Sequence, residues 1–552
     1  MTESHVAVSA TGLLADFNRA GALTWADVHP AQQLGHLFGE KDARVQLALA
    51  LTVRALRSGS ICLDLDRIRE LDHGEDEVSI PDSWWPQADG WLAALEASPA
   101  VTVGDGPGGD RPLRLVDGAL YLERHFADQE SVRRALLSRL GTAPASGEPE
   151  GQEAAIDLAL TSPVTVIAGG PGVGKTYTIE RIITRLREAD PDVRIALAAP
   201  TGKAAARMTE SLGDGSLKAS TLHALLGKRP GSMTRFQHHA DNPLPHDVVI
   251  IDEMSMVSMV LMSRLLDALK PSARLVLVGD PDQLSSVDAG SVLADITRAP
   301  AATGIVARLV RNYRFTGAIQ HLATAIRDGD SDRALEVLAG GDAAVRLASV
   351  AEGTPALRDR VVTAGGRVFR AAASGEAAEA LAALEGHRLL CGHRRGAFGV
   401  AHWTRQVQSW LVEGVPGYSV DGEFHAGRPV MVTANRPEFG LHNGDTGVVL
   451  VDGERAQAWF RAGGRLTAFS PFLLDGLVSV HAMTVHKAQG SQFDDVSVVL
   501  PPPGSPLLTR ELLYTAVSRA RSSVLLLGDP EAVAEAVSNP ARRMSRLAER
   551  LR

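Results

Sequence analysis

A glycine-rich loop between an apolar run and an amphipathic stretch constrains this chain more than any other feature. The loop consists of Gly169, Gly170, Pro171, Gly172, Val173, Gly174, Lys175 and Thr176, followed by Tyr177. Residues 164–168 read as a strand, and residues 177–187 have the apolar spacing of a helix. Glycines let backbone N–H groups turn towards a phosphate, and the helix N-terminus adds partial positive charge. In such loops the lysine reaches the terminal phosphates and the hydroxyl ligates Mg²⁺, so the sequence predicts a nucleotide-binding loop.

Length and composition limit the class of protein. A chain of 552 residues is too long for one hydrophobic core, so two to four domains are expected. With 45% hydrophobic and 22% charged residues, it has the composition of a soluble globular protein. The net charge of −9 gives no global attraction to nucleic acid, although a local basic channel suffices for binding. Cys62 and Cys391 lie far apart, which argues against a disulfide framework or a thiolate metal site. We find no signal peptide or bilayer-spanning run, and expect a cytoplasmic protein without membrane association.

From residue 152 onwards, short apolar runs alternate with helical stretches. This alternation is typical of a parallel sheet with helices on both faces. The first four runs are residues 164–168, 194–199, 248–251 and 275–278. Ligands bind where the strands of such sheets end, and each of these runs is followed by a polar loop.

Two of these loops carry side chains suited to phosphoryl transfer. The run at 248–251 ends in the adjacent carboxylates Asp252 and Glu253. Downstream of a phosphate-binding loop, this pair predicts that Asp252 holds Mg²⁺ and that Glu253 orients or deprotonates the attacking water. After the run at 275–278, Gln283 is placed to hydrogen-bond a γ-phosphate and that water. A structural turn is the alternative for this loop, because Asp-Pro-Asp favours turns.

Other polar segments leave two interpretations open. Thr201 and Lys203 either contact a substrate phosphate or form a helix cap with a solvated lysine. Arg314 can reach a γ-phosphate from a second domain, and the neighbouring Tyr313 can stack on adenine. Arg519 lies near the end of a helical stretch at 512–521, where it either pairs with the helix dipole or contacts the γ-phosphate.

The two remaining regions differ in sequence pattern from the core that carries the motifs. Residues 1–112 carry no catalytic constellation and read as a mostly helical domain. Its Trp84, Trp85 and Trp91 either pack internally or meet a partner protein. Residues 427–470 contain short alternating runs between glycine turns, with a hairpin signal at 442–445. This pattern predicts a small barrel inserted into a second α/β domain.

In this order, the segments resemble the motif series of superfamily 1 DNA helicases. The series is GGPGVGKT, APTGKAA, DEMSMV, GDPDQL, NYRF, VHKAQGSQFD and LLYTAVSRAR. It looks most like the RecD-type subunits of RecBCD complexes (exodeoxyribonuclease V). The resemblance implies an α/β fold of tandem RecA-like P-loop NTPase domains, with ATP between them and single-stranded DNA across their top. We expect a partner-docking domain at 1–112 and RecA-like domains at 113–302 and 303–552. The second should carry an SH3-like insertion at about 424–475.

The resemblance also implies roles for individual residues. Catalytic roles fall on Lys175, Asp252, Glu253, Gln283, Arg314 and Arg519. Thr176 and Asp252 would bind Mg²⁺, and Gln152 and Tyr313 would bind the adenine of ATP. Motifs associated with the DNA strand contain Thr201, Lys203, His486 and Gln489.

The function implied is an ATP-dependent 5′→3′ helicase subunit that unwinds and processes double-strand DNA ends for recombinational repair. Its partners would be DNA and RecB-like and RecC-like subunits. Residues 44–65 and 112–124 are similar to the region of RecD that docks on RecC. The chain shows no acidic nuclease constellation, so nuclease activity would belong to the RecB-type partner. Ser285 departs from the proline that many relatives have after the Gln-Leu pair, without affecting a catalytic role.

Three alternatives remain from the sequence. A stand-alone RecD-like helicase carries a larger N-terminal region, for which 112 residues leave little room. An architectural subunit with a vestigial ATPase does not need the intact Lys175, Glu253, Gln283 and Arg519. A P-loop kinase or other small-molecule phosphotransferase would not explain the arginines and the His-Lys-Ala-Gln-Gly motif of the second domain.

Overall fold

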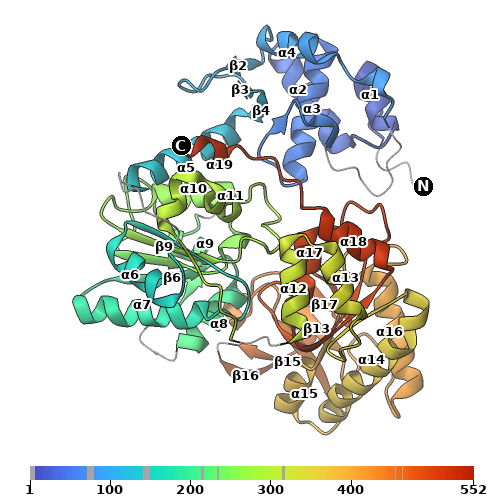
Figure 1. Ribbon diagram of the computed structural model, residues 1–552. Helices are drawn as coiled ribbons and strands as arrows, with labels where there is room; N and C mark the ends of the chain where they lie inside the picture. Colours follow the sequence, from blue (N-terminus) through green and yellow to red (C-terminus); the bar gives the residue numbers. More distant parts are fainter. Residues whose placement is uncertain are drawn as a thin grey trace.

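The computed structural model describes residues 6–70, 80–140, 149–212, 217–229, 231–232, 235–313, 317–453, 455–462 and 464–552. Within these residues, Figure 1 shows an N-terminal domain above two α/β domains that lie side by side. Each α/β domain contains its own parallel sheet, and an antiparallel sheet is attached to the second. The fold is therefore the predicted pair of RecA-like domains. None of the described helices has the length and apolar character needed to cross a bilayer.

The first RecA-like domain is built on a six-stranded parallel sheet of order β10-β5-β9-β8-β6-β7. Its strands are β5 (Val164–Ala168), β6 (Ile195–Ala199), β7 (Ser220–Thr221), β8 (Val248–Ile251), β9 (Arg274–Gly279) and β10 (Val306–Arg308). The helices are α6 (Gln152–Thr161), α7 (Lys175–Ala189), α8 (Gly202–Leu212), α9 (Leu222–Leu226), α10 (Met259–Asp267) and α11 (Val292–Arg298). In β5, Val166 packs into one apolar cluster with α10, whereas Ile167 packs into another with α7. Both faces are covered, which explains the uninterrupted apolar runs.

The second RecA-like domain has a five-stranded parallel sheet of order β11-β20-β19-β12-β18. Its strands are β11 (Val345–Ala348), β12 (His387–Cys391), β18 (Ala482–Thr484), β19 (Phe493–Val499) and β20 (Ala520–Leu527). The helices are α12 (Ala318–Asp328), α13 (Ser331–Ala339), α14 (Val350–Ala373), α15 (Ala377–Leu384), α16 (Val400–Gly414), α17 (Arg510–Val517) and α18 (Pro530–Ser538). The helix predicted at 512–521 ends earlier, because Ala520 already pairs with Phe493 in the sheet. Arg519 consequently lies in the turn before β20.

A separate antiparallel sheet forms the insertion, in the order β16-β15-β14-β13-β17. Its strands are β13 (Pro429–Val432), β14 (Thr446–Asp452), β15 (Arg455–Ala462), β16 (Arg465–Phe469) and β17 (Leu477–Ser479). Val430, Val449 and Phe460 are fully buried in a core that belongs to this sheet. The alternating runs thus form the predicted β-module, and the hairpin signal corresponds to the turn before β14.

The N-terminal region combines helices with a four-stranded sheet of order β1-β4-β3-β2. The helices are α1 (Gly12–Arg19), α2 (Trp25–Leu37), α3 (Ala43–Arg57), α4 (Ala88–Glu96) and α5 (Glu123–Leu140). The strands are β1 (Leu63–Asp64), β2 (Val101–Val103), β3 (Leu113–Val116) and β4 (Ala119–Leu122). This sheet crosses the expected domain boundary at 112, because β3 and β4 pair with β2 and β1.

The tryptophans of this region pack internally. The rings of Trp85 and Phe17 meet edge to face, with centroids 4.9 Å apart. Trp91 is buried, and its indole N–H donates to the backbone oxygen of Arg44 at 2.9 Å. Trp84 is partly buried against the same apolar cluster. The packing interpretation therefore accounts for all three side chains.

Short 3₁₀ turns and a final helix complete the described elements. The 3₁₀ turns are η1 (Ile68–Glu70), η2 (Asp82–Trp84), η3 (Met254–Met256), η4 (Pro300–Ile305), η5 (Pro437–Phe439), η6 (Pro471–Leu473) and η7 (His486–Ala488). After α18 the chain leaves the second RecA-like domain and returns to the first (Figure 1). It ends there in α19 (Leu547–Arg550), which lies beside α5 and α11.

Candidate active site

The glycine-rich loop joins β5 to α7 at the end of the first sheet. Gly172 and Gly174 have φ of 84° and 85°, a region that side chains other than glycine rarely adopt. A Cβ atom on Gly174 would also lie 2.3 Å from Nε2 of Gln152. The Lys175 ammonium donates to the backbone oxygens of Gly169 and Gly170, at 2.7 and 2.9 Å. The lysine is therefore folded back into the loop that its sequence predicts to hold phosphates.

A cleft of about 480 Å³ opens beside this loop, between the two parallel sheets. Side chains from both α/β domains line it, including Lys175, Thr176, Asp252, Glu253, Gln283, Tyr313 and Arg519. The cationic side chains of Lys175 and Arg519 and the Thr176 hydroxyl suit a nucleoside triphosphate. Mg²⁺ usually takes only one or two protein carboxylates together with substrate phosphates. In the described part of the chain, no group of three His, Cys, Asp or Glu side chains could hold a metal alone. The donor set thus fits MgATP better than a dedicated metal cage.

Asp252 and Glu253 follow β8 directly, where the fully buried strand Val248–Ile251 emerges at the cleft. Oδ1 of Asp252 accepts from the backbone N–H of Glu253 at 2.8 Å. Burial and the Glu253 carboxylate raise the pKa of Asp252 to about 6, while Lys175 opposes this shift. Glu253 has φ of 54°, in the left-handed region. Such a conformation costs on the order of 1–3 kcal/mol in a residue with a side chain and is concentrated at functional sites.

Gln283 connects the two RecA-like domains. Its Nε2 donates to Oδ2 of Asp280 at 2.7 Å, and its Oε1 accepts from Nη2 of Arg519 at 3.0 Å. The Tyr514 hydroxyl donates to the same Asp280 oxygen at 3.2 Å. Arg519 is buried, which lowers its pKa, and its Nε donates to the backbone oxygen of Thr515 at 3.1 Å. The helix-end interaction and the cleft position of Arg519 therefore coexist.

The residues expected at adenine lie around the same loop. Nε2 of Gln152, at the start of α6, donates to the backbone oxygen of Val173 at 3.3 Å. The backbone N–H of Tyr313 donates to Gly172 at 2.9 Å, and its ring lies 5.1 Å below the Arg311 guanidinium. Tyr177 is half-exposed and lies outside the lining of the cleft. Arg314 lies outside the described residues.

The residues expected at DNA fall into two groups. Oγ1 of Thr201 accepts from the backbone N–H of Ala204 at 3.2 Å and so caps α8. His486 lies in η7, where burial lowers its pKa. Lys203 and Gln489 instead bridge the two domains. The ammonium of Lys203 donates to Oγ of Ser491 at 2.8 Å, and Nε2 of Gln489 donates to the backbone oxygen of Leu284 at 2.7 Å. Because the ammonium of Lys203 is bonded to Ser491, the solvated-lysine interpretation is wrong. Burial also lowers the pKa of Lys203 to about 8.

The structure adds cleft residues that the sequence interpretation did not single out. Arg207 lines the cleft, and its guanidinium donates to the backbone oxygen of Gly490 in the other domain. Next to the cleft, Asp280 accepts hydrogen bonds from Gln283 and from Tyr514 of the second domain. A signal for Arg207 exists, because it lies four residues after Lys203 on α8 and therefore on the same helix face.

Three family descriptions match parts of the chain. The "AAA domain" matches residues 152–289, which include the glycine-rich loop, Asp252 and Gln283. "RecBCD enzyme subunit RecD, N-terminal domain" matches residues 19–121. "UvrD-like helicase C-terminal domain" matches residues 479–527, which include His486 and Arg519.

Two of the solved structures that match part of the chain are Pif1 helicases. A Bacteroides Pif1 bound to single-stranded DNA has a TM-score of 0.39 and 17% identity, over 68% of this chain and 91% of that one. Pif1 from Candida albicans has a TM-score of 0.37 and 18% identity, over 69% and 95%.

Whole-chain relatives are much closer. The RecBCD enzyme subunit RecD of Mycolicibacterium smegmatis is 46% identical, over 96% of this chain and 97% of its own length. The subunit of the same name from Mycobacterium tuberculosis is 43% identical over 100% and 99%. The ATP-dependent RecD2 DNA helicase of Deinococcus radiodurans is 31% identical, over 83% of this chain but 63% of its own length. The chain belongs to the family of RecD helicase subunits of the RecBCD enzyme.

Proposed function

We propose that this chain is an ATP-dependent helicase subunit that translocates 5′→3′ on single-stranded DNA. Within a RecBCD-type enzyme it would unwind double-strand ends for recombinational repair. One observation carries the proposal: the predicted hydrolytic residues of the first domain face Arg519 of the second across one cleft. Gln283 is already hydrogen-bonded to Arg519 at 3.0 Å. A change at the phosphate end of the cleft can therefore affect both domains.

ATP with Mg²⁺, when bound, supplies the phosphoanhydride bond whose hydrolysis drives the cycle. Lys175 and Thr176 would hold the phosphates and the metal, with Asp252 as the carboxylate ligand. Glu253 would take the proton from the attacking water, because its backbone turn aims it into the cleft beside Asp252. Arg519 would stabilise charge on the terminal phosphate, with Gln283 orienting the water. We assign Arg314 the same kind of role as Arg519.

Movement along DNA would follow from opening and closing of this cleft. The Lys203–Ser491 and Gln489–Leu284 hydrogen bonds cross between the domains, so they must break or shift when the domains separate. Both pairs come from segments whose motifs suggest contact with the DNA strand. We therefore propose that Thr201 and His486 contact the strand. Lys203 and Gln489 would couple binding of the strand to opening and closing of the cleft.

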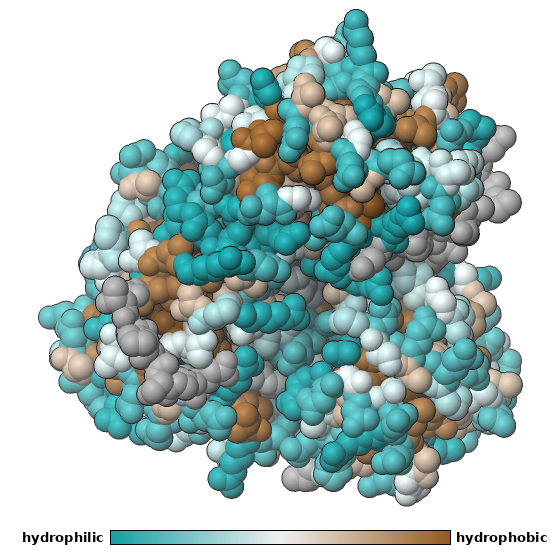
Figure 2. All heavy atoms as spheres, turned by 45° about the horizontal axis from the view of Figure 1, so that its top comes forward, coloured by the Kyte–Doolittle hydropathy of each residue, from teal (hydrophilic) through white to brown (hydrophobic). Residues whose placement is uncertain are grey.

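We propose that the N-terminal domain docks on a RecC-like subunit and that a RecB-like subunit supplies nuclease activity. The first part is supported by the RecD N-terminal match over residues 19–121. It is also supported by apolar side chains on the outside of this domain, where Figure 2 shows brown patches. Exposed apolar residues of the domain include Trp25, Leu37, Leu92 and Val103. Apolar patches on a soluble domain commonly mark protein–protein contacts.

The ATPase rate with and without single-stranded DNA tests the proposal, measured beside Lys175→Gln. Strong stimulation that the substitution abolishes is the expected result. Turnover that ignores DNA, in the chain alone and with RecB- and RecC-like partners added, would contradict a helicase and favour a phosphotransferase. If a complex containing Lys175→Gln unwinds as fast as the parent complex, this ATPase is vestigial and the subunit is architectural.

A further inference from the structure

The last residues of the chain form a segment that ties the second RecA-like domain to the rest of the molecule. We call residues 539–552 the C-terminal strap. The backbone N–H of Met544 donates to Oγ of Ser60 at 3.0 Å, and its oxygen accepts from Ile61 at 2.8 Å. Leu547 and Leu551 are fully buried in the apolar cluster shared by the N-terminal and first RecA-like domains. The strap is therefore held by backbone pairing and by apolar burial.

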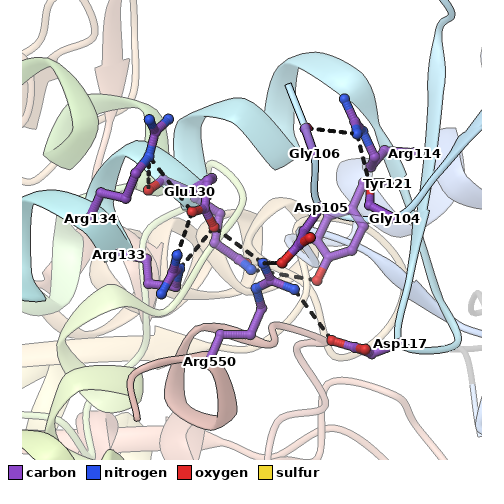
Figure 3. Close-up of polar contacts among 11 residues, drawn as sticks. Gly104, Asp105, Gly106, Arg114, Asp117, Tyr121, Glu130, Arg133, Arg134 and Arg550 are labelled. Atoms are coloured by element: carbon purple, nitrogen blue, oxygen red, sulfur yellow. Dashed lines mark hydrogen bonds and ion pairs between the residues drawn. The ribbon is translucent and has the colours of Figure 1, made fainter. Parts of the chain in front are cut away.

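Charged pairs fix the end of the strap. Arg546 donates to Oδ2 of Asp64 at 2.7 Å. In Figure 3, the Arg550 guanidinium lies among three carboxylates that come from different elements. Its nitrogens are 3.2 Å from Glu130 on α5, 3.3 Å from Asp117 and 3.8 Å from Asp105. The last two carboxylates belong to loops of the N-terminal sheet, so Arg550 joins that sheet to α5.

Arg543 occupies the point where all three domains meet. Its Nη1 donates to the backbone oxygen of Ser286 and, at 3.5 Å, to that of Asp288 in the first RecA-like domain. Gly59 of the N-terminal domain has φ of +89°, and a Cβ there would lie 2.8 Å from Cζ of Arg543. On the side of the second RecA-like domain, the charge of Arg543 adds to burial in lowering the pKa of His486.

The loop that Arg543 contacts leads directly to Gln283. Its residue Ser286 donates its backbone N–H to Ser255, two residues after Glu253, at 3.0 Å. At the other end of the loop, Gly290 donates its N–H to the backbone oxygen of Gly59 at 2.9 Å. The loop thus runs from the cleft to the N-terminal domain, and Arg543 is bonded to its middle.

We propose that Arg543 is a positioning residue that holds the 284–290 loop, and through it sets Gln283 in the cleft. Because the strap also contacts the N-terminal domain, the position of Gln283 would depend on how that domain is held. Docking of a protein partner on that domain would thereby alter ATP turnover without touching the nucleotide. The inference rests on the proposed function and adds a route of regulation to it.

The test compares Arg543→Gln with the parent chain, both with single-stranded DNA present. Glutamine keeps most of the aliphatic stem but removes the charge and the forked donors. We expect the kcat for ATP hydrolysis to fall about three- to thirty-fold, the range typical of long-range coupling. The KM for ATP should change less than twofold, because no phosphate-binding group is altered. Arg543→Lys should recover part of kcat, since it restores the charge without the planar fork.

Hydrogen exchange provides a readout independent of turnover. In Arg543→Gln the amides of Ser286 and Gly290 should exchange faster than in the parent, whereas those of the strap near Met544 should not. Arg552→Ala is the matched control, because Arg552 is exposed and its Nε donates only within its own turn, to Glu549 at 2.6 Å.

Unchanged kcat and loop exchange in Arg543→Gln would overturn the inference, as would an equal loss in Arg552→Ala. Equal acceleration of exchange along the whole strap would also overturn it, because Arg543 would then serve only to pack the strap. The proposed function fails differently, through a parent chain whose ATPase ignores DNA. The exchange comparison stands even in that case.

Discussion

The second RecA-like domain is joined to the rest of the molecule at two junctions of opposite character. At the cleft, the contacts are side-chain hydrogen bonds: Lys203 to Ser491, Gln489 to Leu284 and Arg519 to Gln283. At the strap, the contacts are buried apolar side chains and backbone pairing around Met544. Single hydrogen bonds contribute only about 0.5–1.5 kcal/mol net, whereas burying one Leu contributes about 1.5–3 kcal/mol. Each contact at the cleft is therefore weaker than the burial of one leucine of the strap, which agrees with the proposed opening of the cleft.

The largest effect should come from removing the arginine that crosses the cleft. Arg519→Ala should keep nucleotide affinity but lower the DNA-stimulated kcat by roughly 10³–10⁵-fold, the range for arginines that act across a domain boundary. We predict the same for Arg314→Ala. ATPase kinetics together with equilibrium nucleotide binding measure both quantities. Arg521→Ala is the control, because Arg521 pairs with Asp494 at 3.2 Å on the surface. Equal kcat in Arg519→Ala and the parent would remove Arg519 from the catalytic assignment.

At the strap junction, we expect a substitution to change the free energy of unfolding. Leu547 is fully buried, so Leu547→Ala should lower the free energy of unfolding by about 2–5 kcal/mol. Urea unfolding, followed by fluorescence of the N-terminal tryptophans, measures the loss. Leu37→Ala provides the comparison, because Leu37 is 72% exposed. Similar losses in both variants would mean that burial of the strap is not what holds this junction.

A buried acid beneath the strap gives the junction a pH dependence. Burial raises the pKa of Asp295 on α11 from 3.8 to about 7, while Ser545 of the strap opposes the shift. The folded chain therefore binds this proton more tightly than the unfolded chain. Its contribution to stability is complete below pH 3.8 and is lost as pH rises through about 7.

Asp295→Asn should remove this loss, which reaches at most about 1.4 kcal/mol per pH unit. Unfolding free energies measured from pH 5 to 8 should then fall less steeply in the variant than in the parent. Asp89→Asn, at an exposed position on α4, should reproduce the parent curve. Parallel curves for all three chains would show that Asp295 stays ionised beneath the strap.

The smallest effect is expected at Lys203, whose ammonium is bonded to Ser491 of the other domain. Burial lowers its pKa from 10.5 to about 8, so the unfolded chain binds the proton more tightly. Stability should therefore rise as pH increases from about 8 to 10.5, and Lys203→Met should flatten this rise. Thermal unfolding across that range measures it. A rise that persists in Lys203→Met must come from another group. Lys218→Met, which alters a lysine without a cleft-crossing bond, is the comparison variant.

The sequence by itself determined the parts whose physics is local. Glycines with positive φ and the lysine behind them define the loop before α7, and uninterrupted apolar runs define strands covered on both faces. Because parallel strands end at the same edge, Asp252 and Gln283 could be expected beside Lys175. The alternating runs after residue 427 similarly predicted the inserted β-module.

Only the tertiary structure decided how distant segments meet. It bonded Lys203 to Ser491, placed Arg207 in the cleft and joined Arg519 to Gln283, which is 236 residues away in sequence. It also carried β3 and β4 across the expected boundary and brought the strap back to the N-terminal domain. No periodicity encodes these contacts, because each depends on the packing and register of two elements at once. Local conformational preferences therefore fixed the chemistry of the motifs, and packing between domains fixed how those motifs act on one another.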